Sequence, residues 1–243
     1  MTRTGHHVGM IPPGNQAEGP QSIEVSGREL VGLLRPFVTA PDRPPSGTAD
    51  GAPEVLPGLV AVIAAQMGDQ LTFLPSRVIA ELGGWDAVLE LAMTNLRRLP
   101  PMSAASVRAV EGHADSVVHE LRCADPFGAS RICDLNGLLT TADVRLGAHG
   151  LLVAAPTWYV VLLHAITGPT VLVALELMAK AASAENESAP DHMRVSPDVF
   201  FIAPGGGVQR VAYGDGDDRI QINTTGLLGD VLFGHEGVLR EFR

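Results

Sequence analysis

The sequence predicts an α+β fold in which strand-strand-helix units repeat and build a mainly antiparallel sheet with helices on one face. Short apolar runs occur in pairs separated by glycine-containing turns, which is typical of antiparallel strands. Each pair precedes a segment whose apolar residues recur every three or four positions, the spacing of one helix face. A chain of 243 residues can also bury a large core without disulfides or metals.

The paired runs define the elements that we expect from residue 59 onward. The predicted strands are residues 59–65, 71–74, 107–110, 116–121, 151–155, 158–165, 199–203 and 208–213. The predicted helices are residues 76–82, 85–96, 129–139 and 171–184. The last strand pair flanks Gly205-Gly206-Gly207, which we interpret as a hairpin turn because no Lys-Ser/Thr pair of a phosphate-binding loop follows it. The unit at 151–184 has the strongest apolar signal, so we expect it to form the centre of the core.

The region before residue 58 is predicted to lie outside the main domain. Residues 1–21 and 40–57 contain too few apolar side chains to offset the entropy of ordering, so we expect a disordered tail and a flexible linker. Between them, residues 22–39 are predicted to contain a short helix, because Ser26 is a preferred N-cap and leucines follow at helical spacing. Residues 58–243 are expected to form a single α+β domain.

Composition excludes several classes of protein. The net charge of −10 repels phosphate backbones, so no nucleic-acid partner is expected. The most apolar stretch, 151–175, is interrupted by proline, histidine and glycine, and the first 20 residues lack a signal-peptide pattern. We therefore expect no membrane span and a cytoplasmic location. Lys180 is the only lysine among 17 basic residues, a bias that we interpret as a GC-rich bacterial origin.

The two cysteines, Cys123 and Cys133, lack the spacing of a zinc site. We expect both to be buried, reduced thiols. No cofactor is predicted, because no metal-binding or nucleotide-binding motif is complete. The acidic run at 215–218 lacks the final glutamate of a calcium loop, since Gly226 stands at that position.

Four short stretches resemble one protein family. They are Asn95-Leu96-Arg97-Arg98-Leu99-Pro100, Ala129-Ser130-Arg131-Ile132, the strand pair 151–165 around Pro156, and Val195-Ser196-Pro197 leading into 199–201. In this order, over roughly residues 59–211, the chain resembles the YtpQ-like proteins, an uncharacterised bacterial family. Thr157-Trp158-Tyr159 departs from the family, which tends to have polar residues there. The resemblance implies a fold and a cytoplasmic setting, but it implies no activity.

Arg97, Arg98 and Arg131 are the candidate site residues. Arginine forks suit carboxylates, so these side chains are predicted to contact an anion or an acidic partner. A structural explanation stands beside this one. Arg97 and Arg98 close the helix predicted at 85–96, where cations favourably face the negative end of the helix dipole.

Other polar clusters give weaker signals. His113, Asp115, His119 and Glu120 are dense enough for a metal site, but adjacent strand residues point to opposite faces, so His119 and Glu120 would diverge. His164 lies in an apolar run with no nucleophile nearby, and the Gly-x-Ser-x-Gly pattern of serine hydrolases is absent from the sequence. We interpret His164 as a hydrogen-bonded structural residue.

These observations lead to two functional hypotheses. The first is a non-enzymatic bacterial interaction protein, such as an immunity, secretion-chaperone-like or regulatory module, that binds a protein partner. The second is an enzyme or small-ligand-binding protein whose site is assembled from distant residues, for example His164 with Asp134 or Glu120. Sequence spacing does not separate them, and the oligomeric state is left open.

Overall fold

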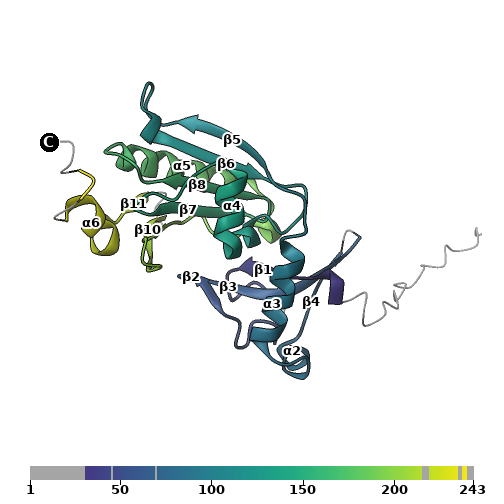
Figure 1. Cartoon of the computed structure of the whole chain (residues 1–243). Helices are drawn as coiled ribbons and strands as arrows, with labels where there is room; N and C mark the ends of the chain where they lie inside the picture. Colours follow the sequence, from purple (N-terminus) through teal and green to yellow (C-terminus); the bar gives the residue numbers. More distant parts are fainter. Residues whose placement is uncertain (1–30, 45, 69, 215–218, 235–236, 240–243) are drawn as a thin grey trace, which may run out of the picture.

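The computed structural model describes residues 31–44, 46–68, 70–214, 219–234 and 237–239 (Figure 1). The predicted α+β class is confirmed, because helices combine with strands whose pairings are all antiparallel. The strands form two sheets, of four and seven strands, in place of the one sheet that we expected. The predicted tail 1–21 and the acidic run 215–218 lie outside the described residues.

The smaller sheet is built around one long strand. Its strands are β1 (Leu34–Thr39), β2 (Glu54–Leu56), β3 (Leu59–Met67) and β4 (Gln70–Phe73). Strand β3 pairs with β1 along one edge and with β2 and β4 along the other. Helices α2 (Ser76–Glu81) and α3 (Trp85–Leu96) follow, and their buried residues Ile79, Val88 and Ala92 pack against Ile63 of β3. The bounds predicted for α3 are those observed.

The expectations for residues 22–57 are corrected. Within the described part of 22–39 only residues 31–33 are helical, and the following six residues form β1. The leucine spacing suggested a helix, but pairing with the buried strand β3 outweighs that local preference. The presumed linker 40–57 contains β2, and both Thr48 and Leu56 are buried. The folded unit therefore begins before residue 58.

The larger sheet has the strand order β11-β10-β9-β7-β8-β6-β5. Its strands are β5 (Ser103–Arg108), β6 (Val117–Arg122), β7 (Leu151–Thr157), β8 (Val160–Ala165), β9 (Val199–Ile202), β10 (Val208–Gly214) and β11 (Ile220–Ile222). The hairpin predicted around the three glycines joins β9 to β10. Strand β11 was not predicted, because three residues give too short an alternation to recognise.

Helices cover both faces of the larger sheet, whereas the sequence predicted one. Helix α5 (Val171–Ser188) packs on one face against Leu152, Leu162 and Phe201, with the unpredicted α6 (Gly226–Phe233) beside it. The other face, with Val153, Leu163 and Phe200, is covered by 3-10 helix η2 (Ala129–Asp134), α4 (Leu135–Thr141) and part of the smaller sheet. Strand β7 explains the difference, because every one of its residues is buried and both of its faces need cover.

No helix in the described part of the chain combines the length and the apolar character that a transmembrane helix requires.

We predict that Leu152→Ala and Leu162→Ala each lower the free energy of unfolding by about 2–5 kcal/mol, because both leucines are buried between β7, β8 and α5. For a chain of this size, the loss corresponds to a decrease in Tm of roughly 4–20 °C. Calorimetry of the purified variants measures it. Leu146→Ala is the matched control, since Leu146 is 50% exposed. Equal decreases in Tm for all three variants would contradict the assignment of the core.

Candidate functional site

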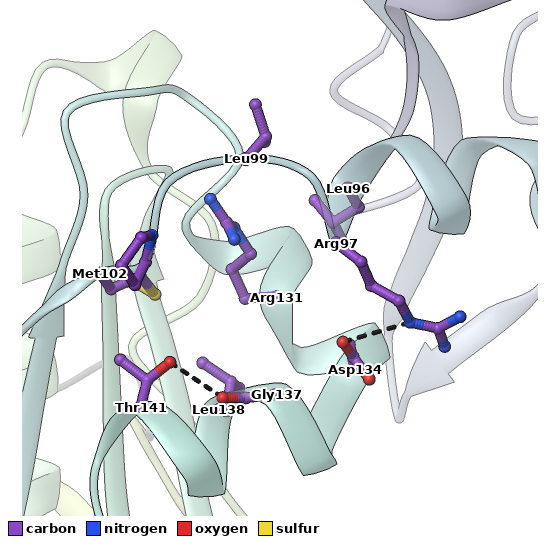
Figure 2. Close-up of a pocket in the computed structure, with 10 residues that line it drawn as sticks. Leu96, Arg97, Leu99, Met102, Arg131, Asp134, Gly137, Leu138 and Thr141 are labelled. Atoms are coloured by element: carbon purple, nitrogen blue, oxygen red, sulfur yellow. Dashed lines mark hydrogen bonds and ion pairs between the residues drawn. The ribbon is translucent and has the colours of Figure 1, made fainter.

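A pocket of about 240 Å³ lies where α3, η2 and α4 meet the segment that enters β5 (Figure 2). Its lining residues are Leu96, Arg97, Leu99, Pro101, Met102, Arg131, Asp134, Gly137, Leu138 and Thr141. The walls are mainly apolar, and two arginines and one aspartate supply the charge. We refer to it as the arginine pocket.

The arginine pocket forms because three elements end or begin around it. Helix α3 ends at Leu96, which is buried, and the chain then crosses through residues 97–102 to the first residue of β5. Pro100 and Pro101 in this crossing segment cannot continue a helix. Opposite the segment, η2 passes into α4, and this turn presents Arg131 and Asp134.

Arg97 turns toward the η2–α4 turn. Its Nε donates to Oδ2 of Asp134 at 3.3 Å, and the side chain remains 58% exposed. No other hydrogen bond of this guanidinium is present within the described part of the chain, so both Nη groups are available to a ligand. An ion pair this exposed contributes little to stability, typically about 0–1 kcal/mol.

Arg131 is held more rigidly. Its side chain is 12% exposed, and Nη2 donates to the carbonyl oxygen of Pro100 at 3.0 Å and to Oδ2 of Asp125 at 3.3 Å. The Nε–H is buried and has no acceptor among the described residues. Figure 2 shows this side chain between Met102 and Arg97, beneath the segment that carries Leu99. Arg131 therefore anchors the crossing segment and retains unused hydrogen-bonding capacity.

The structure brings together two of the three predicted site residues. Arg97 and Arg131 line one pocket although they lie 34 positions apart in the sequence. Arg98 is exposed and does not line it. Arg97 and Arg131 already have carboxylate partners in the chain, so a role for them in binding an anion or a partner stays a prediction.

Strand β5 begins next to the arginine pocket and has a free edge. All six of its residues are exposed, and among the described residues it pairs only with β6, in a register without a bulge. The amide of Ala109 donates to the carbonyl oxygen of Ser116, which continues the ladder by one residue. Since bonded and non-bonded residues alternate in antiparallel pairs, the odd-numbered residues bond to β6 and the even-numbered ones face outward. The outward main-chain groups belong to Ala104, Ser106 and Arg108.

The apolar pattern of the sequence did not predict this edge. The second unit was expected to begin with a strand at 107–110, whereas β5 spans Ser103–Arg108. Its first four residues, Ser-Ala-Ala-Ser, contain no large apolar side chain and therefore no alternation to detect. Only the pairing with β6 reveals it.

The histidine and acid cluster does not converge on a metal site. Within the described residues no group of three or more His, Cys, Asp or Glu side chains is arranged to hold an ion. His119 accepts or donates a hydrogen bond with Ser106 Oγ at 3.0 Å, while Glu120 pairs with Arg122. Asp115 accepts from Thr170 Oγ1 at 2.8 Å. Partial burial opposes ionisation of Asp115, but the hydrogen bonds from Thr170 outweigh it and lower its pKa.

His164 is buried and hydrogen-bonded. Its Nδ1 lies 2.9 Å from the carbonyl oxygen of Val117, which can only accept, so Nδ1 carries the proton. Nε2 is buried without a partner in the described part of the chain. Because protonation would bury an unpaired N–H and a charge, burial lowers the pKa of His164.

The enzyme hypothesis paired His164 with Asp134 or Glu120, and neither pair forms a hydrogen bond or ion pair in the described part of the chain. His164 stands opposite Leu152 on the α5 face of the larger sheet, whereas Asp134 lines the arginine pocket on the α4 face. Glu120 is held by Arg122, which also binds Glu185 of α5 through two hydrogen bonds.

Comparison of the chain with models of protein families, with curated proteins and with solved structures finds no match. The resemblance to the YtpQ-like proteins therefore stays a prediction that rests on the four sequence stretches alone.

We predict that stability falls as the pH drops below about 6.5, the ordinary pKa of His164. The pKa of His164 is lowered in the folded chain, so the unfolded chain takes up the proton first. The stabilisation is complete above this pH and is lost below it. His119, which burial affects in the same direction, adds to the effect.

Tm measured between pH 8 and pH 5 tests this expectation. His164→Asn should flatten the dependence, and the same change in a His119→Asn background separates the two residues. His113→Asn, at a side chain that is 54% exposed, is the control. An unchanged slope in His164→Asn would show that another group titrates.

Both cysteines are partly buried in the structure, whereas the sequence predicted that they are buried, and we predict that both label slowly in the native chain. Burial raises the pKa of Cys123 and of Cys133 to about 12, from 9.0 in an exposed thiol. At pH 8 the thiolate fraction, and with it the rate of reaction with a disulfide reagent, falls by about a thousandfold relative to unfolded chain. Ser188→Cys, at an exposed position, is the positive control for rapid labelling. Labelling of the native chain at the control's rate would contradict the predicted burial of the thiols.

Proposed function

We propose that this chain is a non-enzymatic protein-interaction module that binds an extended segment of a partner protein along the free edge of β5. The single observation that carries the proposal is the exposed, continuous six-residue edge strand. Strand addition to such an edge is a common mode of peptide recognition, in which main-chain hydrogen bonds supply affinity. The proposal includes a cytoplasmic setting, which the free cysteines Cys123 and Cys133 support, and a bacterial one, which the scarcity of lysine supports.

The two edges of the larger sheet differ in a way that favours β5. Natural sheets protect their edges with short strands, prolines, bulges or charged side chains. The far edge, β11, has three residues, whereas β5 has six and contains no proline, no bulge and no charge before Arg108. An edge left open in this way is suited to a partner strand.

The side chains of β5 are also suited to close approach. Ser103, Ala104, Ala105 and Ser106 are small, so an incoming strand meets little steric obstruction. Their neighbours on β6 add selectivity, because the partly exposed His119 lies on one face and Glu120 and Arg122 lie on the other. Long side chains of a partner segment would reach across the small residues of β5 toward them.

The proposal is tested with a library of random peptides displayed on phage and selected against the full chain. We expect the selected peptides, made synthetically, to bind about tenfold more weakly to Ala104→Pro. Proline removes an outward N–H and adds a ring at the edge, while the ladder to β6 keeps its bonds. Ala104→Ser retains the N–H and is the matched control. Both variants must keep the Tm of the unaltered chain to within a few degrees.

Amide hydrogen exchange gives a second readout. We expect the amides of Ala104, Ser106 and Arg108 to become protected when the peptide binds, because they face outward in the free chain. A selection without binders, or binders that ignore Ala104→Pro and protect none of these amides, would show the proposal to be wrong.

A further inference from the structure

We infer that the bound segment runs antiparallel to β5 and carries, just after its paired residues, an aspartate or glutamate side chain that binds to Arg97 and Arg131 in the arginine pocket. The inference rests on the proposed function and names the chemistry and the direction of the partner segment.

The direction follows from the sheet itself. Every strand pairing in the two sheets is antiparallel, and antiparallel ladders are slightly more stable per residue than parallel ones. A segment antiparallel to β5 leaves the edge at Ser103. Its next residues then continue beside the crossing segment 97–102, which forms one wall of the arginine pocket. The residue class at that position is therefore selected by the pocket.

The positive charge near the Ser103 end of β5 favours an acidic side chain in the partner segment. Arg97, Arg98 and Arg131 are gathered there against Asp125 and Asp134, which leaves a surplus of one positive charge. The whole chain carries a net charge of −10, so this positive region differs in sign from the protein as a whole. The other end of β5 has no such surplus, because Glu111 follows Arg108 closely in the chain.

Arg97 and Arg131 have N–H groups without acceptors in the described part of the chain, so they can bind an acidic group. Arg97 engages Asp134 through Nε alone, so its Nη groups can donate to a second carboxylate. The Nε–H of Arg131 has no acceptor in the described part of the chain, and a small shift of this side chain would bring it to a ligand oxygen. Guanidinium–carboxylate hydrogen bonds are roughly twice as strong as neutral ones.

The walls of the arginine pocket add to this preference. Leu96, Leu99, Met102 and Leu138 surround the charged groups with apolar surface. Such walls lower the local dielectric constant and strengthen the attraction between opposite charges. They also contact the methylene groups of an acidic side chain. A volume of about 240 Å³ is large enough to hold one such side chain.

The test uses the synthetic peptides selected above, restricted to those whose affinity depends on Ala104→Pro. We expect them to share an Asp or Glu after the segment that pairs with β5. Changing that residue to Asn or Gln should weaken binding about five- to tenfold. Arg97→Ala should weaken binding of the original peptide by a similar factor and should have little effect on the neutralised peptide.

The controls separate a direct contact from a general charge effect. Arg98→Ala makes the same change of charge one residue away, outside the pocket, and should weaken binding less than twofold. Arg131→Lys keeps the charge but removes the fork, so binding should weaken without loss of the fold. Peptides with an amidated C-terminus should bind as well as those with a free one.

The possible outcomes are distinct. If no selected peptide depends on the β5 edge, both the proposed function and this inference are wrong. Edge-dependent peptides that lack the acidic residue, carry it before the paired segment, or ignore Arg97→Ala and Arg131→Lys overturn the inference alone. Loss of binding on amidation, with no effect of neutralising the side chain, assigns the pocket to a C-terminal carboxylate and overturns it as well.

Discussion

Complete burial of strand β7 is the constraint on which the rest of the structure depends. Its seven residues lie at the centre of the larger sheet, and all of them are inaccessible to solvent. A strand with apolar side chains on both sides requires apolar cover on both faces of its sheet. Helix α5 supplies one cover, and η2, α4 and part of the smaller sheet supply the other. The two sheets therefore share one core.

For η2 to cover the second face of the larger sheet, the chain just before η2 must approach the β7–β8 turn closely. Gly128 precedes η2, and a Cβ atom there would lie 2.6 Å from the carbonyl oxygen of Trp158 in the β7–β8 turn. Without a side chain at this position, the next amide, of Ala129, donates to the same carbonyl at 3.0 Å. The contact draws η2 against the larger sheet. Ser130 of η2 then bonds the amide of Val38 in β1, which ties the smaller sheet to the same place.

This arrangement also produces the arginine pocket and the free edge. Because α3 belongs to the smaller sheet and β5 to the larger one, the chain must cross between them through residues 97–102. The crossing leaves a hollow beside η2 and α4, and it delivers the chain to the outermost position of the larger sheet. The candidate site thus lies at the junction of the two sheets.

Local patterns in the sequence determined the elements that are stabilised by their own periodicity. The bounds of α3, the pairing of β7 with β8 and the burial of Leu175 and Met178 on α5 all follow from apolar spacing. In the site, residue type led to the prediction that Arg97, Arg98 and Arg131 contact an anion or an acidic partner, and the structure brings Arg97 and Arg131 to one pocket. The sequence did not predict that Arg97 and Arg131 lie in the same pocket. They are 34 positions apart, and local spacing carries no information about contacts between distant segments.

Tertiary structure alone decided the elements whose stability comes from a distant partner. The leucines around the start of β1 have helical spacing, yet six pairings with β3 make residues Leu34–Thr39 a strand. Strand β5 has no pattern of its own and exists because β6 offers a ladder. The division into two sheets, the second helical cover and the meeting of Arg97 with Arg131 arise in the same way. Each depends on hydrogen bonds and buried contacts between segments far apart in the chain, which a local period does not encode.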